Sequence, residues 1–312
     1  MGMEDDNLKR RLEALNGGPL TNLPEVVTRL TDPNVELQRK LTKPKVRPGD
    51  RNRAVVISDD TSTSTIATTV PRIPKQSDVT LNQAVDGMIR TTSFGEYYFV
   101  QRGLDEIAPW FLGRLEALEY AFGYAMLDSR RRRTSAANIK DAIFVDIETL
   151  GLSDEPLFLI GTFRVDAELG VVCEQFFARN LTEEASILHA FQSVTSESTV
   201  LITFNGMSFD LPYIRSRSEE HSVSGPKYRS HIDLLLEARK RVARQVTNCK
   251  LTTLETELCG RRREGDIPGN KIPAAYSKYL ETGNASKISD ILHHNVLDLV
   301  TTADLLIHFF GA

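Results

Sequence analysis

The sequence contains little cysteine and no long apolar stretch. Its 312 residues include only Cys173, Cys249 and Cys259. An odd number without a C-x-x-C pair excludes a disulfide-stapled secreted module and argues against a zinc ribbon. The unbroken apolar runs are far shorter than the ~20 residues that a membrane helix needs. The first ten residues are too charged for a signal peptide. We therefore expect a cytoplasmic protein without a membrane partner.

The sequence also lacks a large net charge and an early folded segment. A formal net charge of -4 argues against a protein that coats nucleic acid non-specifically. Between Thr42 and Ser77, the chain is rich in proline, serine, threonine and charge. Such a composition buries too little apolar surface to offset its ordering entropy. We predict that residues 1–90 are largely disordered or a linker.

The ordered part is predicted to begin with a lead-in segment at residues 91–140. The run Tyr97 to Val100 follows a glycine turn and is typical of a strand or hairpin. Residues 106–128 carry apolar side chains at helical spacing and predict a core-facing helix. The positions that carry this spacing are Leu112, Leu115, Leu118, Phe122 and Met126.

Residues 141–312 are predicted to form one α/β domain. Three strands are followed by a helix, a fourth strand and further helices, which favours a mixed central sheet flanked by helices. The strands are expected at 142–147, 157–166, 171–178 and 199–204, and the main helices at 183–193, 209–217 and 289–310.

Two acidic residues lie at the end of the first of these strands. Asp146 and Glu148 are two positions apart, so on a strand both carboxylates point to the same face. Like charges ~4 Å apart repel by ~4 kcal/mol at an effective dielectric near 20. The pair is either a functional acidic site or an ordinary strand end that emerges into solvent.

Two later segments carry further acids. Asp210 lies in the first turn of a helix, where a simple preference for the helix dipole also explains an acid. His294 and Asp298 are neighbours on one helix face, which is also compatible with an ordinary polar surface. Together, four converging carboxylates repel one another unless cations lie among them. Oxygen ligands select Mg²⁺ or Mn²⁺ over zinc, and two such ions suit a phosphoryl displacement.

The motifs D-x-E, N-G-x-x-F-D and H-x-x-x-D resemble those of the DEDD superfamily of 3′→5′ exonucleases, which has a ribonuclease H-like fold. More narrowly, residues 93–312 resemble the YprB-like ribonuclease H-like domain family. This closer resemblance is carried by F-V-D-I-E-T-L-G-L (144–152), F-L-I-G-T (158–162), V-L-I-T-F-N-G-M-S-F-D-L-P (200–212), H-I-D-L-L-L-E-A-R-K (231–240), C-K-L-T-T-L-E (249–255), D-I-P-G (266–269) and H-N-V-L-D-L (294–299).

The resemblance implies a metal-dependent exonuclease site. It implies that two Mg²⁺ or Mn²⁺ ions are bound by Asp146, Glu148, Asp210 and Asp298. Asn205 and Asp233 are expected beside these ligands without binding the metal. Lys250, Arg262 and Asp266 also lie in the family's motifs, but the sequence assigns no role to them there.

A histidine near Asp298 is expected to act as the base. The histidine subclass of the superfamily places its base at the position of His293, whereas the pattern H-N-x-x-D selects His294. Around a helix, His294 is about 40° from Asp298 and His293 about 140°. We therefore favour His294, and keep His293 as the alternative if the helix begins only at residue 294.

The charge pattern indicates where nucleic acid could bind. Residues 227–266 hold ten basic and six acidic side chains, in a chain that is acidic as a whole. This segment is either a path for phosphates beside the site or a solvated surface. Its candidate contacts are Arg239, Lys240, Arg241, Lys250 and Arg262. Together with the resemblance, this pattern predicts a nuclease acting on DNA or RNA. The alternative is a non-catalytic nucleic-acid-binding module, and no protein partner is indicated.

Overall fold

The computed structural model describes residues 79–127, 138–166 and 170–311, which belong to one compact unit. The expectations for residues 1–78 lie outside the described residues. Of the expected linker, the last part contains the short helix α4 (Leu81–Ala84) and the beginning of strand β1. Regular structure therefore begins before residue 90.

The described residues form a seven-stranded mixed sheet. Its order is β1-β2-β5-β4-β3-β6-β7. The neighbouring pairs β1–β2, β2–β5, β5–β4 and β4–β3 are antiparallel. Strand β6 is parallel to β3, and β7 is parallel to β6. The strands are β1 (Met88–Thr92), β2 (Gly95–Gly103), β3 (Ala142–Thr149), β4 (Leu157–Asp166), β5 (Gly170–Phe177), β6 (Val200–Thr203) and β7 (Ser230–Asp233). This arrangement confirms the predicted mixed sheet.

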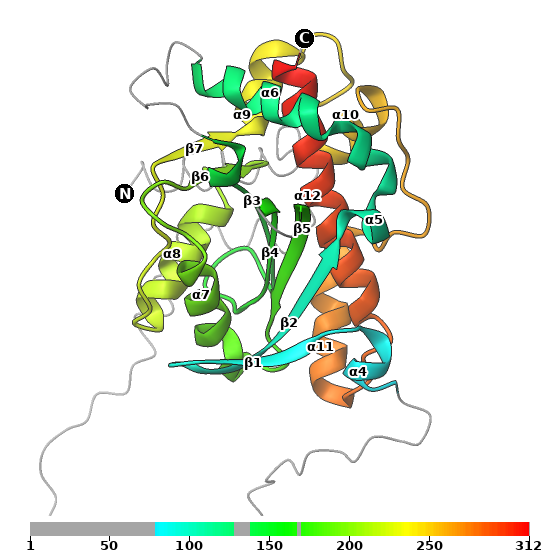
Figure 1. Ribbon diagram of the computed structural model, residues 1–312. Coiled ribbons are helices and arrows are strands. Elements are labelled where there is room, and N and C mark those ends of the chain that lie inside the picture. The colour runs from blue at the N-terminus through cyan, green and yellow to red at the C-terminus, as the bar shows by residue number, and fades with distance from the viewer. Residues whose placement is uncertain (1–78, 128–137, 167–169, 312) are drawn as a thin grey trace, which may run out of the picture. The chain divides into compact units, whose positions relative to one another are not determined.

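Helices cover the sheet, and the longest one, α12, lies along β3 and β4 (Figure 1). The α-helices after α4 are α5 (Leu104–Ile107), α6 (Leu115–Leu127), α7 (Glu184–Ser193), α8 (Asp210–Glu220), α9 (Leu234–Arg241), α10 (Leu251–Glu257), α11 (Ile272–Thr282) and α12 (Ile288–Phe310). Short 3-10 turns are η1 (Pro109–Arg114), η2 (Ile139–Asp141), η3 (Leu181–Glu183) and η4 (Gly269–Lys271). Within the described stretches, no helix is both long and apolar enough to cross a membrane.

The side chains of β3 alternate between two apolar cores. Ala142 and Phe144 join a core with α6, α9, α10 and α12. Ile143, Val145 and Ile147 join a core with α7, α8 and α11. Because successive strand residues point to opposite faces, Asp146 and Glu148 continue the face of Ala142 and Phe144. The two acids therefore point to the α12 side.

The prediction of a single helix at 106–128 was wrong for the first half of that range. The chain forms α5, then the 3-10 turn η1, and α6 begins only at Leu115. Pro109 explains the break, since it has no N–H and disfavours a helical conformation of the residue before it. Leu118, Phe122 and Met126 are buried as expected, but Leu112 is 43% exposed.

Candidate active site

The acidic part of β3 lies where the sheet opens. Strand β6 pairs with β3 only along residues 142–144. Beyond that point, β4 continues to pair with β3 on one side, so the other side of Asp146 and Glu148 is free of a strand. The chain leaving β6 turns there and begins helix α8 at Asp210. The sheet topology thus places Asp210 near Asp146 and Glu148.

A tight turn after β6 positions Asp210. Asn205 has a left-handed backbone with φ 68°. A Cβ on Gly206 would approach the Thr203 side-chain oxygen to 2.3 Å, so a larger residue does not fit there. The carboxylate of Asp233 accepts hydrogen bonds from the backbone N–H of Asn205 and of Met207, both at 2.9 Å. Asp233 therefore builds the turn, and Asn205 takes part through its backbone.

The four predicted carboxylates influence one another strongly. Burial raises the pKa of Asp146 and of Glu148 well above their usual values, and the charge of Asp298 raises both further. Burial also raises the pKa of Asp210 to about 7, although backbone hydrogen bonds at Asp210 and Ile147 oppose the rise. Since each of these groups is affected by Asp298, the structure brings together the acids of all three motifs. We call these four residues the acidic centre.

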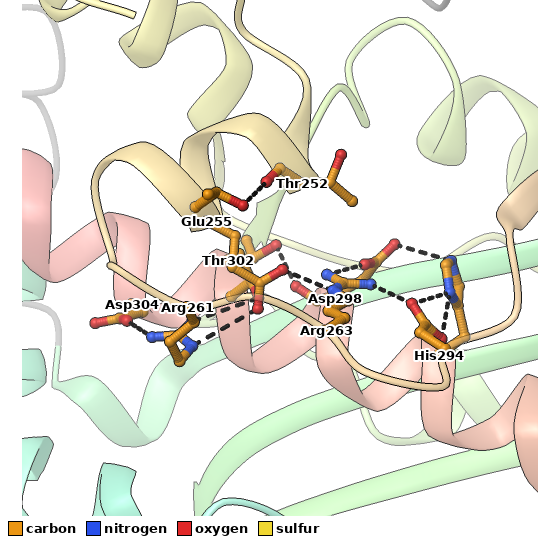
Figure 2. Close-up of polar contacts among 11 residues, drawn as sticks. Thr252, Glu255, Arg261, Arg263, His294, Asp298, Thr302 and Asp304 are labelled. Carbon is orange, nitrogen blue, oxygen red and sulfur yellow. Dashed lines mark hydrogen bonds and ion pairs between the residues drawn. The ribbon is translucent and has the colours of Figure 1, made fainter.

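An arginine that the sequence did not single out contacts the acidic centre. The Arg263 Nη2 atom lies 2.6 Å from Asp298 Oδ1, with the geometry of an ion pair rather than a directed hydrogen bond. Its Nε donates to Glu255 at 2.6 Å, and its Nη1 donates to Asp266 at 3.2 Å (Figure 2). Burial alone would lower the pKa of Arg263, but Asp298 and Glu255 outweigh it and raise the pKa. Arg263 is thus a fixed positive charge at one end of the centre.

His294 lies between two carboxylates. Its Nδ1 is 2.9 Å and 3.0 Å from the two oxygens of Asp266, and its Nε2 is 3.6 Å from Asp298 Oδ2. A carboxylate accepts hydrogen bonds, so these contacts assign a proton to Nδ1. In the neutral ring, Nε2 then carries the lone pair on the side of Asp298.

His293 is placed differently. Helix α12 begins at Ile288, so the condition under which His293 could replace His294 is not met. The His293 side chain is exposed. Partial burial and the neighbouring Arg102 lower its pKa. The geometry therefore favours His294 beside Asp298.

The loop between α10 and η4 carries the contacts that the sequence did not predict. Arg261 lies 4.0 Å over the Trp110 ring. It also pairs with Asp304 of α12, while Arg263 contacts Asp298 (Figure 2). Asp266 contacts His294. The D-I-P-G motif contained Asp266, so a signal for that residue was present. The run Arg261 to Arg263 gives no sign of which arginine turns inward.

The chemistry of the acidic centre fits a hard divalent cation. All four side chains offer carboxylate oxygen. Burial and neighbouring acidic charges raise the pKa of Asp146, Glu148 and Asp210, and a bound cation would favour their ionised forms. Across the three described stretches, no group of three His, Cys, Asp or Glu side chains already has metal-binding geometry. Asp298 is instead engaged by Arg263.

The predicted nucleic-acid contacts lie at and after the end of α9. Arg239, Lys240, Lys250 and Arg262 are exposed. Arg241 is half-buried, because its Nε pairs with Glu237 at 3.0 Å and its guanidinium lies 4.2 Å over the Phe310 ring. Arg262 shares the loop of Arg263, next to the acidic centre.

Comparisons with known proteins agree with this fold. A family model described as the RNase_H superfamily matches residues 143–310, more than half of the chain. The match confirms the predicted ribonuclease H-like fold. The chain is 31% identical over 176 residues to "Uncharacterized protein YprB" of Bacillus subtilis (strain 168), which covers 55% of this chain and 42% of that protein. The chain thus spans less than half the length of this curated relative.

Solved structures of exonuclease I show a weaker similarity. One, titled "The structure of exonuclease I suggests how processivity is achieved", has 15% identity and a TM-score of 0.36, covering 52% of this chain and 39% of that chain. Another is E. coli exonuclease I in complex with a dA16 oligonucleotide, with 16% identity, a TM-score of 0.31, and coverage of 50% and 42%. Overlaps at this level identify neither a substrate nor a reaction.

Proposed function

Because the chain belongs to the RNase H superfamily, we propose that it is a nuclease that uses divalent cations to hydrolyse phosphodiester bonds. The observation that carries the proposal is the acidic centre, which gathers carboxylates from three distant segments, and in which burial and neighbouring acidic charges raise the pKa of Asp146, Glu148 and Asp210. A protein that only binds phosphates gains nothing from gathering acids beside them. The resemblance to DEDD exonucleases supports 3′→5′ polarity on DNA or RNA.

Each residue of the centre has a role in this proposal. Asp146, Glu148, Asp210 and Asp298 would hold Mg²⁺ or Mn²⁺, most simply two ions. When bound, such ions supply charge stabilisation for the attacking and leaving oxygens of the phosphoryl group. Before the ions bind, Arg263 neutralises part of the charge of Asp298.

His294 is proposed as the general base. Asp266 holds the Nδ1 proton and fixes the ring, so that Nε2 is free to take a proton from the attacking water. Asp266 therefore acts through His294 rather than on the substrate. The exposed residues Arg239, Lys240, Lys250 and Arg262 are proposed to contact the phosphate backbone, which carries no base information.

The proposal is tested with 5′-labelled single- and double-stranded DNA and RNA in Mg²⁺, Mn²⁺ or EDTA. We expect labelled products that shorten stepwise from the 3′ end with either metal, no cleavage in EDTA, and recovery when metal is restored. Asp146→Asn is the matched control, since it keeps the side-chain shape and should be inactive. Cleavage that persists in EDTA, or that zinc supports and neither Mg²⁺ nor Mn²⁺ does, would contradict the proposal. Binding of nucleic acid without any cleavage would establish the binding module instead.

A further inference from the structure

Three residues form a row across the sheet beneath α12. In the strand register, Asp146 of β3 pairs with Gly161 of β4, and Gly161 pairs with Gln175 of β5. Paired residues on neighbouring strands share a face. Because Gly161 has no side chain, the row is open at its centre, between the Asp146 and Gln175 side chains.

Asn295 of α12 fills this opening. Its side chain is fully buried, with 0% relative exposure. The Nδ2 group donates to Asp146 Oδ2 at 2.8 Å, and Oδ1 accepts from Gln175 Nε2 at 2.8 Å. Gln175 Nε2 also donates to the backbone oxygen of Leu292 at 2.8 Å. The amide of Asn295 thus bridges an acid of the centre and a buried glutamine.

The direction of these hydrogen bonds is set by Arg102. Its Nη2 donates to Gln175 Oε1 at 3.0 Å, and a guanidinium can only donate. The Nε2 group of Gln175 must therefore donate to Asn295, and Asn295 must accept this hydrogen bond with Oδ1. The Nδ2 donor of Asn295 is left with one orientation, toward Asp146. A buried amide that is fixed at both ends keeps its partner in one rotamer.

Gly161 and Asn295 are sterically matched. A Cβ at position 161 would lie 2.0 Å from Asn295 Oδ1 and 2.7 Å from its Cγ. Such distances force Asn295, or the whole of α12, away from the sheet. Gly161 of the motif F-L-I-G-T and Asn295 of the motif H-N-x-x-D therefore pack against each other.

We propose that Asn295 is a positioning residue that holds the Asp146 carboxylate in its metal-binding orientation, with Gly161, Gln175 and Arg102 fixing the amide. Asn295 donates to Oδ2 of Asp146, and the other carboxylate oxygen, Oδ1, would be available to a cation. This role rests on the proposed function, because Asn295 positions a metal ligand only if Asp146 binds metal. Partners of metal-ligating carboxylates typically contribute 10–100-fold to metal affinity or activity.

The test is a double-mutant cycle of Gly161→Ala and Asn295→Ala, with Mn²⁺ affinity measured by calorimetry and electron paramagnetic resonance. Each single variant should weaken Mn²⁺ binding and lower kcat by about 10–100-fold. In the double variant, the new methyl group no longer meets Asn295, so its loss should equal that of Asn295→Ala alone. Nucleic-acid binding in EDTA should stay unchanged in all three, which a general folding defect would not allow.

Gly123→Ala is the matched control, because a Cβ there meets nothing within 4 Å. If Gly161→Ala fails to fold, Asn295→Leu fills the same space without the hydrogen bonds and should show the same loss of Mn²⁺ affinity. A folded Asn295 variant that binds Mn²⁺ and cleaves like the wild type would overturn the positioning role, and so would two fully additive losses. A wild-type protein that neither binds Mn²⁺ nor cleaves would overturn the proposed function together with this role.

Discussion

Replacing Asp210 by asparagine should stabilise the metal-free protein. Burial is the main cause that raises the pKa of this carboxyl from 3.8 to about 7, and the charges of Asp233 and Asp298 add to it. One pKa unit corresponds to about 1.4 kcal/mol, so the ionised group costs the folded state about 4 kcal/mol at pH 8. The amide removes this cost, but it loses one acceptor for a backbone hydrogen bond, worth about 1 kcal/mol. A gain of about 3 kcal/mol remains.

The gain depends on pH with a definite sign. The pKa of Asp210 is higher in the folded than in the unfolded chain. Between about pH 4 and pH 7, the folded state therefore binds a proton that the unfolded chain has lost, and stability falls as pH rises through this window. At pH 5, the cost of ionisation shrinks to about 2 kcal/mol, and the net gain of the asparagine variant to about 1 kcal/mol.

Thermal unfolding in EDTA at pH 8 and pH 5 measures the effect. For a folded unit of this size, about 3 kcal/mol corresponds to a rise in Tm of roughly 6–12 °C at pH 8, with a much smaller rise at pH 5. Glu119→Gln, on the exposed side of α6, is the matched control and should leave Tm unchanged. Added Mn²⁺ should stabilise the wild type more than the Asp210 variant. An Asp210→Asn protein that is no more stable at pH 8 than the wild type would refute the electrostatic description of the centre.

Two further predictions concern catalysis and binding. His294→Ala should lower the cleavage rate by about 10²–10⁴-fold, whereas His293→Ala should change little; the reverse pattern would transfer the base to His293. Alanine at Arg239, Lys240, Lys250 or Arg262 should weaken nucleic-acid binding uniformly across sequences and reduce the salt slope by about 1 for each lost phosphate contact. The exposed Lys278 of α11 is the control, and an equal loss in Lys278→Ala would mean that these positions form no defined path.

The sequence was sufficient to predict the fold because the elements that build it carry strong local patterns. The strands around Asp146 are apolar runs bounded by turns, and α12 has an apolar face along its whole length. The acids were predictable for the same reason. A pair at i and i+2 on a strand, and a histidine and acid at i and i+4 on a helix, fix side-chain directions without knowledge of the tertiary structure. Helix α11 (Ile272–Thr282) carries the same kind of pattern and was not predicted.

The contacts of the loop after α10 could not be predicted in this way. Arg261, Arg262 and Arg263 are consecutive arginines, yet one binds Asp304, one is exposed and one reaches the acidic centre. No periodicity governs an irregular loop, so its side-chain directions are set only by what it packs against. Asn295 lies in the regular helix α12, but its contact was equally unpredictable, because it depends on a glycine in a distant strand.

The internal partners are distributed unequally over the acidic centre. Asp298 has the ion pair with Arg263, and Asp146 has the hydrogen bond from Asn295. Within the described part of the chain, Asp210 has only backbone hydrogen bonds. For Glu148, the described residues provide no hydrogen bond or ion pair, while burial and three neighbouring acids raise its pKa. A cation therefore gains the most electrostatic energy on the side of Glu148 and Asp210, away from Arg263. If the first metal ion binds there, Glu148→Gln should weaken its affinity more than Asp298→Asn does, because Arg263 already compensates part of the charge of Asp298, whereas the described residues give Glu148 no such partner.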